Sequence, residues 1–120
     1  MKKVISILCV FVIAFSFGAC TTTVKTDKTV DAVAEALDFS NKQEKFFALV
    51  NASDGAGFDT AGGNHAEIYI YTDSKAEDNT DNWGDDGFIT INDDVLLYLE
   101  GDKSSEENQE IINKFDSLKF

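Results

Sequence analysis

The sequence predicts a two-layer α+β domain, in which an antiparallel sheet of three to four strands carries an N-terminal and a C-terminal helix on one face. Two observations lead to this class. Apolar residues recur with helical spacing at both ends of the region 30–120, and short β-rich runs separated by turn residues lie between them. Because each turn is short, neighbouring strands pair as hairpins and no parallel crossover is required.

The composition allows one small domain with a hydrophobic core. Of the 120 residues, 43% are hydrophobic and 12% are aromatic, which is far from the composition of a disordered chain. The 10 basic residues are all lysines and stand against 22 acidic residues, which gives a formal net charge of −12. This acidity argues against nucleic acid as a partner, since phosphate binding needs a basic patch.

The N-terminus has the plan of a secretory signal peptide. Lys2 and Lys3 form its positive region, residues 4–17 are almost entirely apolar, and small residues follow at 18–19. The apolar run is shorter than the about 20 residues that a membrane-spanning helix needs. We therefore expect residues 1–19 to be removed.

The segment Phe17-Gly18-Ala19-Cys20 resembles the lipobox of bacterial lipoproteins, with Phe17 in the place that Leu usually occupies. The resemblance implies that Cys20 becomes the new N-terminus and carries two or three acyl chains, palmitate among them. That number of chains anchors a protein stably to a membrane. An ordinary secreted protein with a free Cys20 is the alternative.

The residues after the lipobox bear on location and on the domain boundary. In the sorting rule of such lipoproteins, Asp after the cysteine retains the protein on the inner membrane; Thr21 stands there instead, which favours the outer membrane or cell surface. We expect residues 20–29 to be the lipidated cysteine and a polar tether, and residues 30–120 to be a single domain. Since Cys9 leaves with the leader, no thiol pair remains for a disulfide.

The first element of the domain is an amphipathic helix. Val30, Val33, Ala34 and Leu37 recur at helical spacing, and Asp31 lies in the first turn, where the helix dipole favours a negative charge.

A second helical segment is predicted directly after it. Ser40 and Gln43 have the spacing of a capping box, and the helix would run to about residue 52. Its buried face would consist of Phe46, Leu49 and Val50. One kinked helix and two separate short helices both fit this part of the sequence.

Two hairpins and a C-terminal helix complete the domain. The predicted segments are strands 58–60 and 65–71 of the first hairpin, the acidic loop 72–86, and strands 87–91 and 95–100 of the second hairpin. Ser104 and Glu107 form a capping box for the last helix. Its apolar side would consist of Ile111, Ile112, Phe115 and Leu118.

This order of elements is similar to that of small bacterial lipoproteins of unknown function, which have a helix, an A-x-D-G turn, a strand with a Glu-Ile-Tyr core, an Asn-led hairpin and a C-terminal helix with a Phe near its end. The matching residues are Ala52-Ser53-Asp54-Gly55, Glu67-Ile68-Tyr69, Asn92-Asp93 and Phe115. The resemblance covers most of the region after the leader and implies no particular activity.

The candidate catalytic residues are few, and the chain is not expected to be an enzyme. His65 is the only histidine, and no nucleophile stands out beside it, so we expect it to be solvated. Glu67 and Glu100 are the candidate pair for a general acid and base, but both are expected to point to solvent, where nothing would separate their pKa values.

The acidic loop offers oxygen ligands of the type that calcium uses, principally Asp81, Asp85 and Asp86. Their spacing does not match an EF-hand, because Trp83 stands at the third place counted from Asp81 and Asp86 stands where glycine is required. The prediction is therefore no metal site and no cofactor, with weak calcium binding as an alternative.

Alternation along the strands places aromatic residues away from the side of Ile68 and Ile70. The aromatic set is Tyr69, Tyr71, Phe88 and Tyr98, a possible face for recognition of a protein or a carbohydrate. The alternative, which we favour, is that these rings pack under the loop that carries Trp83.

The functional expectation is a non-enzymatic, lipid-anchored envelope protein that acts as a binding or interaction module at the outer membrane or cell surface. Its expected partners are the membrane, through the anchor, and an envelope protein or glycan. The alternatives are an accessory subunit of an outer-membrane assembly complex and a weak calcium-dependent binder.

Overall fold

The computed structural model describes residues 24–81, 83 and 86–120. The predicted signal peptide, Cys20 and Asp85 lie outside the described residues. Within the described part, no helix has the length and apolar character that crossing a membrane requires.

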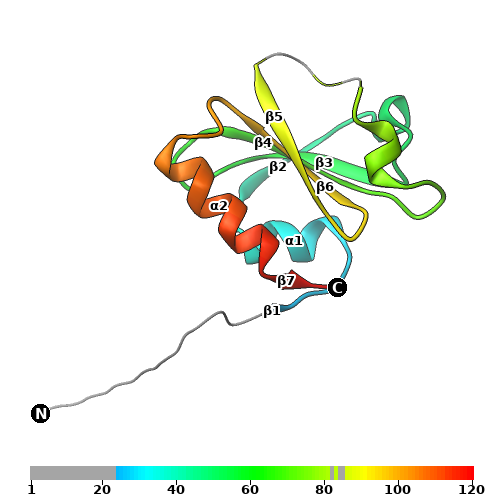
Figure 1. Cartoon of the computed structure of the whole chain (residues 1–120), viewed down its shortest axis with the longest axis horizontal. Helices are drawn as coiled ribbons and strands as arrows, with labels where there is room; N and C mark the ends of the chain where they lie inside the picture. Colours follow the sequence, from blue (N-terminus) through cyan, green and yellow to red (C-terminus); the bar gives the residue numbers. More distant parts are fainter. Residues whose placement is uncertain (1–23, 82, 84–85) are drawn as a thin grey trace, which may run out of the picture.

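The main sheet has five antiparallel strands in the order β2-β3-β4-β6-β5 (Figure 1). The strands are β2 (Ser40–Glu44), β3 (Asp54–Asp59), β4 (His65–Ile70), β5 (Gly87–Asn92) and β6 (Val95–Glu100). The helices α1 (Val30–Ala36) and α2 (Glu106–Asp116) both pack on one face of it (Figure 1). The predicted α+β class with its antiparallel sheet is confirmed, although the sheet has five strands and not three to four.

The core between sheet and helices is built from alternate residues of the strands. Along β6, Val95, Leu97 and Leu99 point toward the helices and are fully buried. From the helices, Val33 and Phe115 complete the same cluster. Strand alternation and helical spacing thus converge on one apolar layer, as the sequence patterns require.

Helix α1 begins and ends close to its predicted bounds. Thr29 is the N-cap, and its hydroxyl accepts a hydrogen bond from the amide of Ala32. Leu37 closes the helix and is buried, and Asp38 then takes a φ of 60°. That left-handed residue separates the helix from the next element.

The predicted helix from Ser40 to about residue 52 is wrong. Ser40–Glu44 forms the edge strand β2, which pairs with β3, and only a 3₁₀ turn, η2 (Phe47–Val50), follows it. Asn41 takes a φ of 60°, which no helix allows, and the register shifts between Ser40 and Gln43. Pairing with a strand that lies later in the chain has overridden the local helical signal.

Both predicted hairpins are present. β3 and β4 pair from Asp54↔Ile70 to Asp59↔His65, so β3 starts earlier than predicted. β5 and β6 are joined by Asp93 and Asp94, whose φ values of 50° and 62° form the two-residue turn typical of tight hairpins.

The C-terminal helix has a different cap from the predicted one. Ser105, not Ser104, is the N-cap, and its hydroxyl accepts from the amide of Asn108. Ser104 instead donates from its amide and its hydroxyl to the carboxylate of Asp102, which lowers the pKa of Asp102. Leu118 is buried in the core as expected, but it lies beyond the helix, in strand β7.

A second, two-stranded sheet joins the two ends of the described chain. β1 (Val24–Lys25) pairs in parallel with β7 (Leu118–Lys119) below the helices (Figure 1). Val24–Lys25, within the predicted tether, thus forms a short strand, while the main sheet is antiparallel and contains no parallel crossover, as predicted. A two-residue strand has no recognisable sequence pattern, because its partner lies at the other end of the chain.

Candidate functional site

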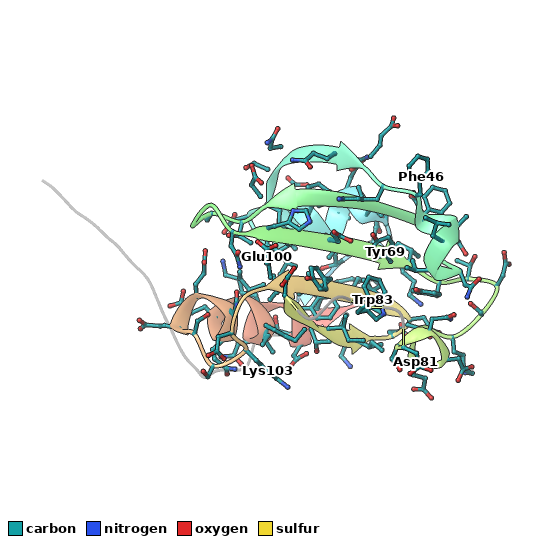
Figure 2. All side chains as sticks on the ribbon, turned by 90° about the horizontal axis from the view of Figure 1, so that it is seen from above. Phe46, Tyr69, Asp81, Trp83, Glu100 and Lys103 are labelled. Carbon is teal, nitrogen blue, oxygen red and sulfur yellow. The ribbon has the colours of Figure 1, made fainter. Side chains whose placement is uncertain are left out.

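The sheet face opposite the helices, hereafter the aromatic face, is the most distinctive surface of the molecule. It carries His65, Glu67 and Tyr69 from β4 and Tyr98 from β6, with Trp83 above them. Figure 2 looks onto this face, with Tyr69 and Trp83 next to each other and Phe46 at the rim. Opposed pairs such as Glu67↔Tyr98 and Tyr69↔Leu96 keep these side chains on one side of the sheet.

Two glycines in β3 make room on this face for side chains of neighbouring elements. Gly55 lies opposite Tyr69 and Gly57 lies opposite Glu67, so β3 presents no side chain beside them. A Cβ atom at Gly55 would collide with the Tyr69 ring, and one at Gly57 would lie 2.8 Å from Cε of Lys45. The alternation of glycine with Ala56 and Phe58 therefore gives β3 one face that packs its own side chains and one face that is covered by Tyr69 and Lys45.

Three aromatic rings form the floor. The centroids of Tyr69 and Trp83 are 5.3 Å apart, and Trp83 stacks on Tyr98 at 6.0 Å with an interplanar angle of 23°. The indole N–H of Trp83 donates to the carbonyl of Asn79, 2.9 Å away, which ties the ring to the acidic loop. The prediction that the aromatic residues pack under the loop carrying Trp83 is confirmed for Tyr69 and Tyr98.

The other two predicted members of the aromatic set have different places. Tyr71 is almost fully buried, and its hydroxyl donates to the carbonyl of Val50, so it holds the η2 segment onto the sheet. Phe88 lies on the opposite side, packed against the core under the helices. The placement of Phe88 on the aromatic face is wrong because β5 pairs with β6 so that Phe88 is opposite the core residue Leu99.

A hydrogen-bonded row of side chains runs along β4. Nε2 of His65 donates to Oε2 of Glu67 over 2.7 Å, and the hydroxyl of Tyr69 donates to Oε1 of Glu67 over 2.6 Å. Nζ of Lys45 lies 3.6 Å from the same Oε2. The expectation that His65 and Glu67 point freely into solvent is wrong: the Glu67 side chain is only 16% exposed.

The electrostatics of this row hold Glu67 ionised. Burial alone would raise the pKa of Glu67, but the hydrogen bonds from Tyr69 and His65 and the charge of Lys45 together lower the pKa below its usual value. Burial and the hydrogen bond to Glu67 raise the pKa of Tyr69 far above its usual value. Tyr69 is therefore a fixed donor and Glu67 a fixed acceptor at every physiological pH.

An open depression of about 490 Å³ lies over the row and the rings. Phe46 and Leu49 stand on its rim and are 85% and 77% exposed, the largest exposure of any bulky apolar side chains in the described part of the chain. A second hollow, lined by residues 44–49, adjoins it. Glu100 adds a negative charge at the far end (Figure 2). The surface combines apolar anchors with a charged rim, as recognition surfaces do.

The predicted calcium ligands are not brought together by the described structure. Asp81 and Asp86 are both exposed, and Asp85 lies outside the described residues. Among the residues that are described, no three His, Cys, Asp or Glu side chains form a group able to hold a metal ion. Weak calcium binding stays a prediction.

Sequence reasoning missed Lys45, Phe46 and Leu49 as members of this surface, because it assigned them to a helix. A usable signal was present in the alternation of Gly55 and Gly57 with apolar residues, since a strand that lacks side chains on one face leaves space for side chains from neighbouring elements.

Comparison with known proteins gives no match. No protein-family model matches the sequence, and neither a curated protein nor a solved structure shows significant similarity to the chain.

Proposed function

We propose that this chain is a non-enzymatic, lipid-anchored envelope protein that binds a partner protein through its aromatic face. The observation that carries the proposal is the exposure of Phe46 and Leu49 beside the open aromatic depression. Bulky apolar groups next to a concave aromatic floor are typical of binding surfaces, where such side chains become the buried anchors.

The position of β1 indicates how the domain would be oriented if Cys20 carries a lipid. Residues 21–23 separate Cys20 from Val24, a stretch that spans at most about 14 Å when extended. Since β1 lies below the helices, a lipid on Cys20 would hold that side toward the bilayer (Figure 1). The aromatic face would then point away from the membrane, where a partner has access to it.

The hydrogen bonding of Glu67 supports binding over catalysis. Both of its carboxylate oxygens already accept hydrogen bonds from Tyr69 and His65, and Lys45 lies beside one of them. A general base needs a lone pair directed at its substrate, and Glu67 uses its oxygens within the fold. The row preorganises the floor of the depression instead.

The binding test compares two variants of the full chain purified from detergent-solubilised membranes. The double variant Phe46→Ser/Leu49→Ser should lose the co-purifying partner protein, because its apolar anchors are gone. Lys103→Ser, an exposed position at the opposite end of the molecule (Figure 2), should retain it. Equal recovery with both variants would refute the aromatic face as the binding surface.

The same purification addresses the accessory-subunit alternative. A stoichiometric complex with integral outer-membrane proteins would favour that role over a free-standing binding module.

The anchor is tested separately by membrane fractionation. Cys20→Ser should move the protein from the membrane to the soluble fraction, because the sulfur that carries the acyl chains is absent. Unchanged partitioning of this variant into detergent would contradict lipidation at Cys20.

A further inference from the structure

The two edges of the five-stranded sheet differ in how they are protected. At the β2 edge, the register shifts between Ser40 and Gln43, Asn41 takes a φ of 60°, and Lys42 and Glu44 project charges. Irregularity and charge are the usual devices that stop a second strand from pairing with an edge. The β2 edge is thus closed to strand addition.

The β5 edge has neither device. Gly87–Asn92 contains no charged residue, and it pairs with β6 without a register shift from Gly87↔Glu100 to Asn92↔Val95. Its two isoleucines, Ile89 and Ile91, are partly buried, so an uncharged strand with an unbroken register forms this end of the sheet.

The hairpin turn determines which main-chain groups face outward. In a two-residue hairpin the closing pair, Asn92 and Val95, is hydrogen-bonded, and from there hydrogen-bonded pairs alternate with pairs that are not hydrogen-bonded. The hydrogen bond from the amide of Gly101 to the carbonyl of Asp86, 2.7 Å long, is where this alternation requires one. The N–H and C=O groups of Ile89 and Ile91 therefore point away from β6.

Nothing in the described structure satisfies these outward groups. Among residues 24–81, 83 and 86–120, no hydrogen bond reaches the main chain of Ile89 or Ile91 from outside the sheet. They form a regular row of donors and acceptors along one edge, which is the template that an added strand requires.

From this geometry we infer that the β5 edge binds an extended segment of a partner protein as a sixth, antiparallel strand. The bound segment has apolar residues at alternate positions and lysines or arginines at its two ends. The acidic residues at the two ends of β5 select for this basic partner. Asp86 stands exposed before the strand and Asp93 stands after it, only partly neutralised by Lys28 at 3.6 Å. This binding is independent of the aromatic face.

A second copy of the chain fits the edge less well. Antiparallel pairing of β5 with itself would bring Asp86 of each copy close to the Asp93-Asp94 turn of the other, which sets like charges against each other at both ends. The net charge of −12 adds to this repulsion and attracts a cationic segment.

The test uses the full chain in detergent and a synthetic peptide of alternating valine and threonine with two lysines at each end. Amide hydrogen exchange should slow at Ile89 and Ile91 when the peptide binds, whereas Phe88 and Thr90 should be protected before and after. Ile89→Pro removes an outward N–H without removing a bond to β6, so it should weaken binding at least tenfold.

Two further probes keep the test independent of how that variant folds. Two peptides methylated on alternate backbone nitrogens should differ: the one whose methyl groups replace the N–H groups facing β5 should not bind, and the one methylated on the intervening nitrogens should bind. Replacing the lysines of the peptide by glutamates should weaken binding at least tenfold. No protection at Ile89 and Ile91, equal binding of the methylated peptides, or equal binding of the glutamate peptide would overturn the inference. A dimer of the chain that Ile89→Pro dissolves would overturn the choice of partner.

Discussion

The two faces of the sheet use the same strands but are stabilised in different ways. The face under the helices is mainly apolar, and strand residues such as Ile68, Leu97 and Leu99 are fully buried there. The aromatic face has rings and ionisable side chains linked by hydrogen bonds, and short 3₁₀ segments and Trp83 cover only part of it. The buried apolar face stabilises the fold, and the partly covered aromatic face leaves a surface to which a partner can bind.

A single strand sets much of this difference. β3 contributes Ala56 and Phe58 to the helix side but only Gly55 and Gly57 to the centre of the other side. Because the missing side chains are replaced by the Tyr69 ring and the Lys45 stem, the aromatic face is shaped by residues from neighbouring elements. Substitutions on the two faces should therefore differ in kind and in size.

The largest effect is expected from Phe115→Ala on the helix side. Phe115 is completely buried between α2 and the sheet, so its removal leaves a cavity and should reduce the free energy of unfolding by about 3–5 kcal/mol. Chemical denaturation of the full chain measures this. A loss below about 1 kcal/mol would mean that α2 contributes little to the core.

A smaller loss is expected from Gly55→Ala on the aromatic face. The new methyl group would collide with the Tyr69 ring and lie 3.0 Å from Cβ of Phe47, at a cost of about 1–3 kcal/mol. Gly57→Ala is the matched control, because the group it meets is the flexible end of Lys45, and it should cost less than about 0.5 kcal/mol. Equal losses would show that the ring does not rest on Gly55.

Glu67→Gln should have an effect that depends on pH. The folded pKa of Glu67 lies below its ordinary value of 4.5, so its carboxylate stabilises the fold above that pH, and this contribution is lost as the pH falls through the folded pKa. We expect the variant to be about 1–2 kcal/mol less stable at pH 7, with the difference vanishing in acid.

Glu110→Gln, at an exposed position of α2, controls for the removal of one negative charge. Thermal unfolding of both variants between pH 7 and pH 3 makes the comparison. A Glu67→Gln difference that does not change with pH would contradict the hydrogen-bonded, ionised row.

The smallest effect on stability is expected from Phe46→Ser and Leu49→Ser. Both side chains are largely exposed, so each substitution should change the free energy of unfolding by less than about 0.5 kcal/mol. The same denaturation measurement checks this. A loss comparable to that of Phe115→Ala would show that these side chains belong to a core, as the predicted helix required.

Most predictions from local signals are confirmed, and the helix predicted from Ser40 to about residue 52 is the exception. The helix at Val30, the hairpin around Asp93-Asp94 and the last helix each depend on spacing or turn chemistry within a few residues, and the structure contains all three. The cap at Ser105 shows the limit of this precision, since Ser104 and Ser105 both suit an N-cap and the first is drawn away by Asp102.

The candidate site was predictable only in part, for a related reason. Alternation along β4 and β6 correctly put Tyr69 and Tyr98 on one face. It did not reveal that His65 and Glu67 share a hydrogen bond or that Lys45 lies beside them, because Lys45 comes from a segment far away in the sequence.

By itself, the sequence determined the α+β class, the two helices, the two hairpins and the alternation of apolar residues that builds the core, because each follows from contacts between near neighbours in the chain. Tertiary structure alone decided that residues 40–44 form an edge strand, that Phe88 faces the helices and that Val24–Lys25 pairs with Leu118–Lys119. The physical reason is that strand pairing depends on a partner that is remote in sequence, and a shift of one residue in that pairing turns every side chain to the other face.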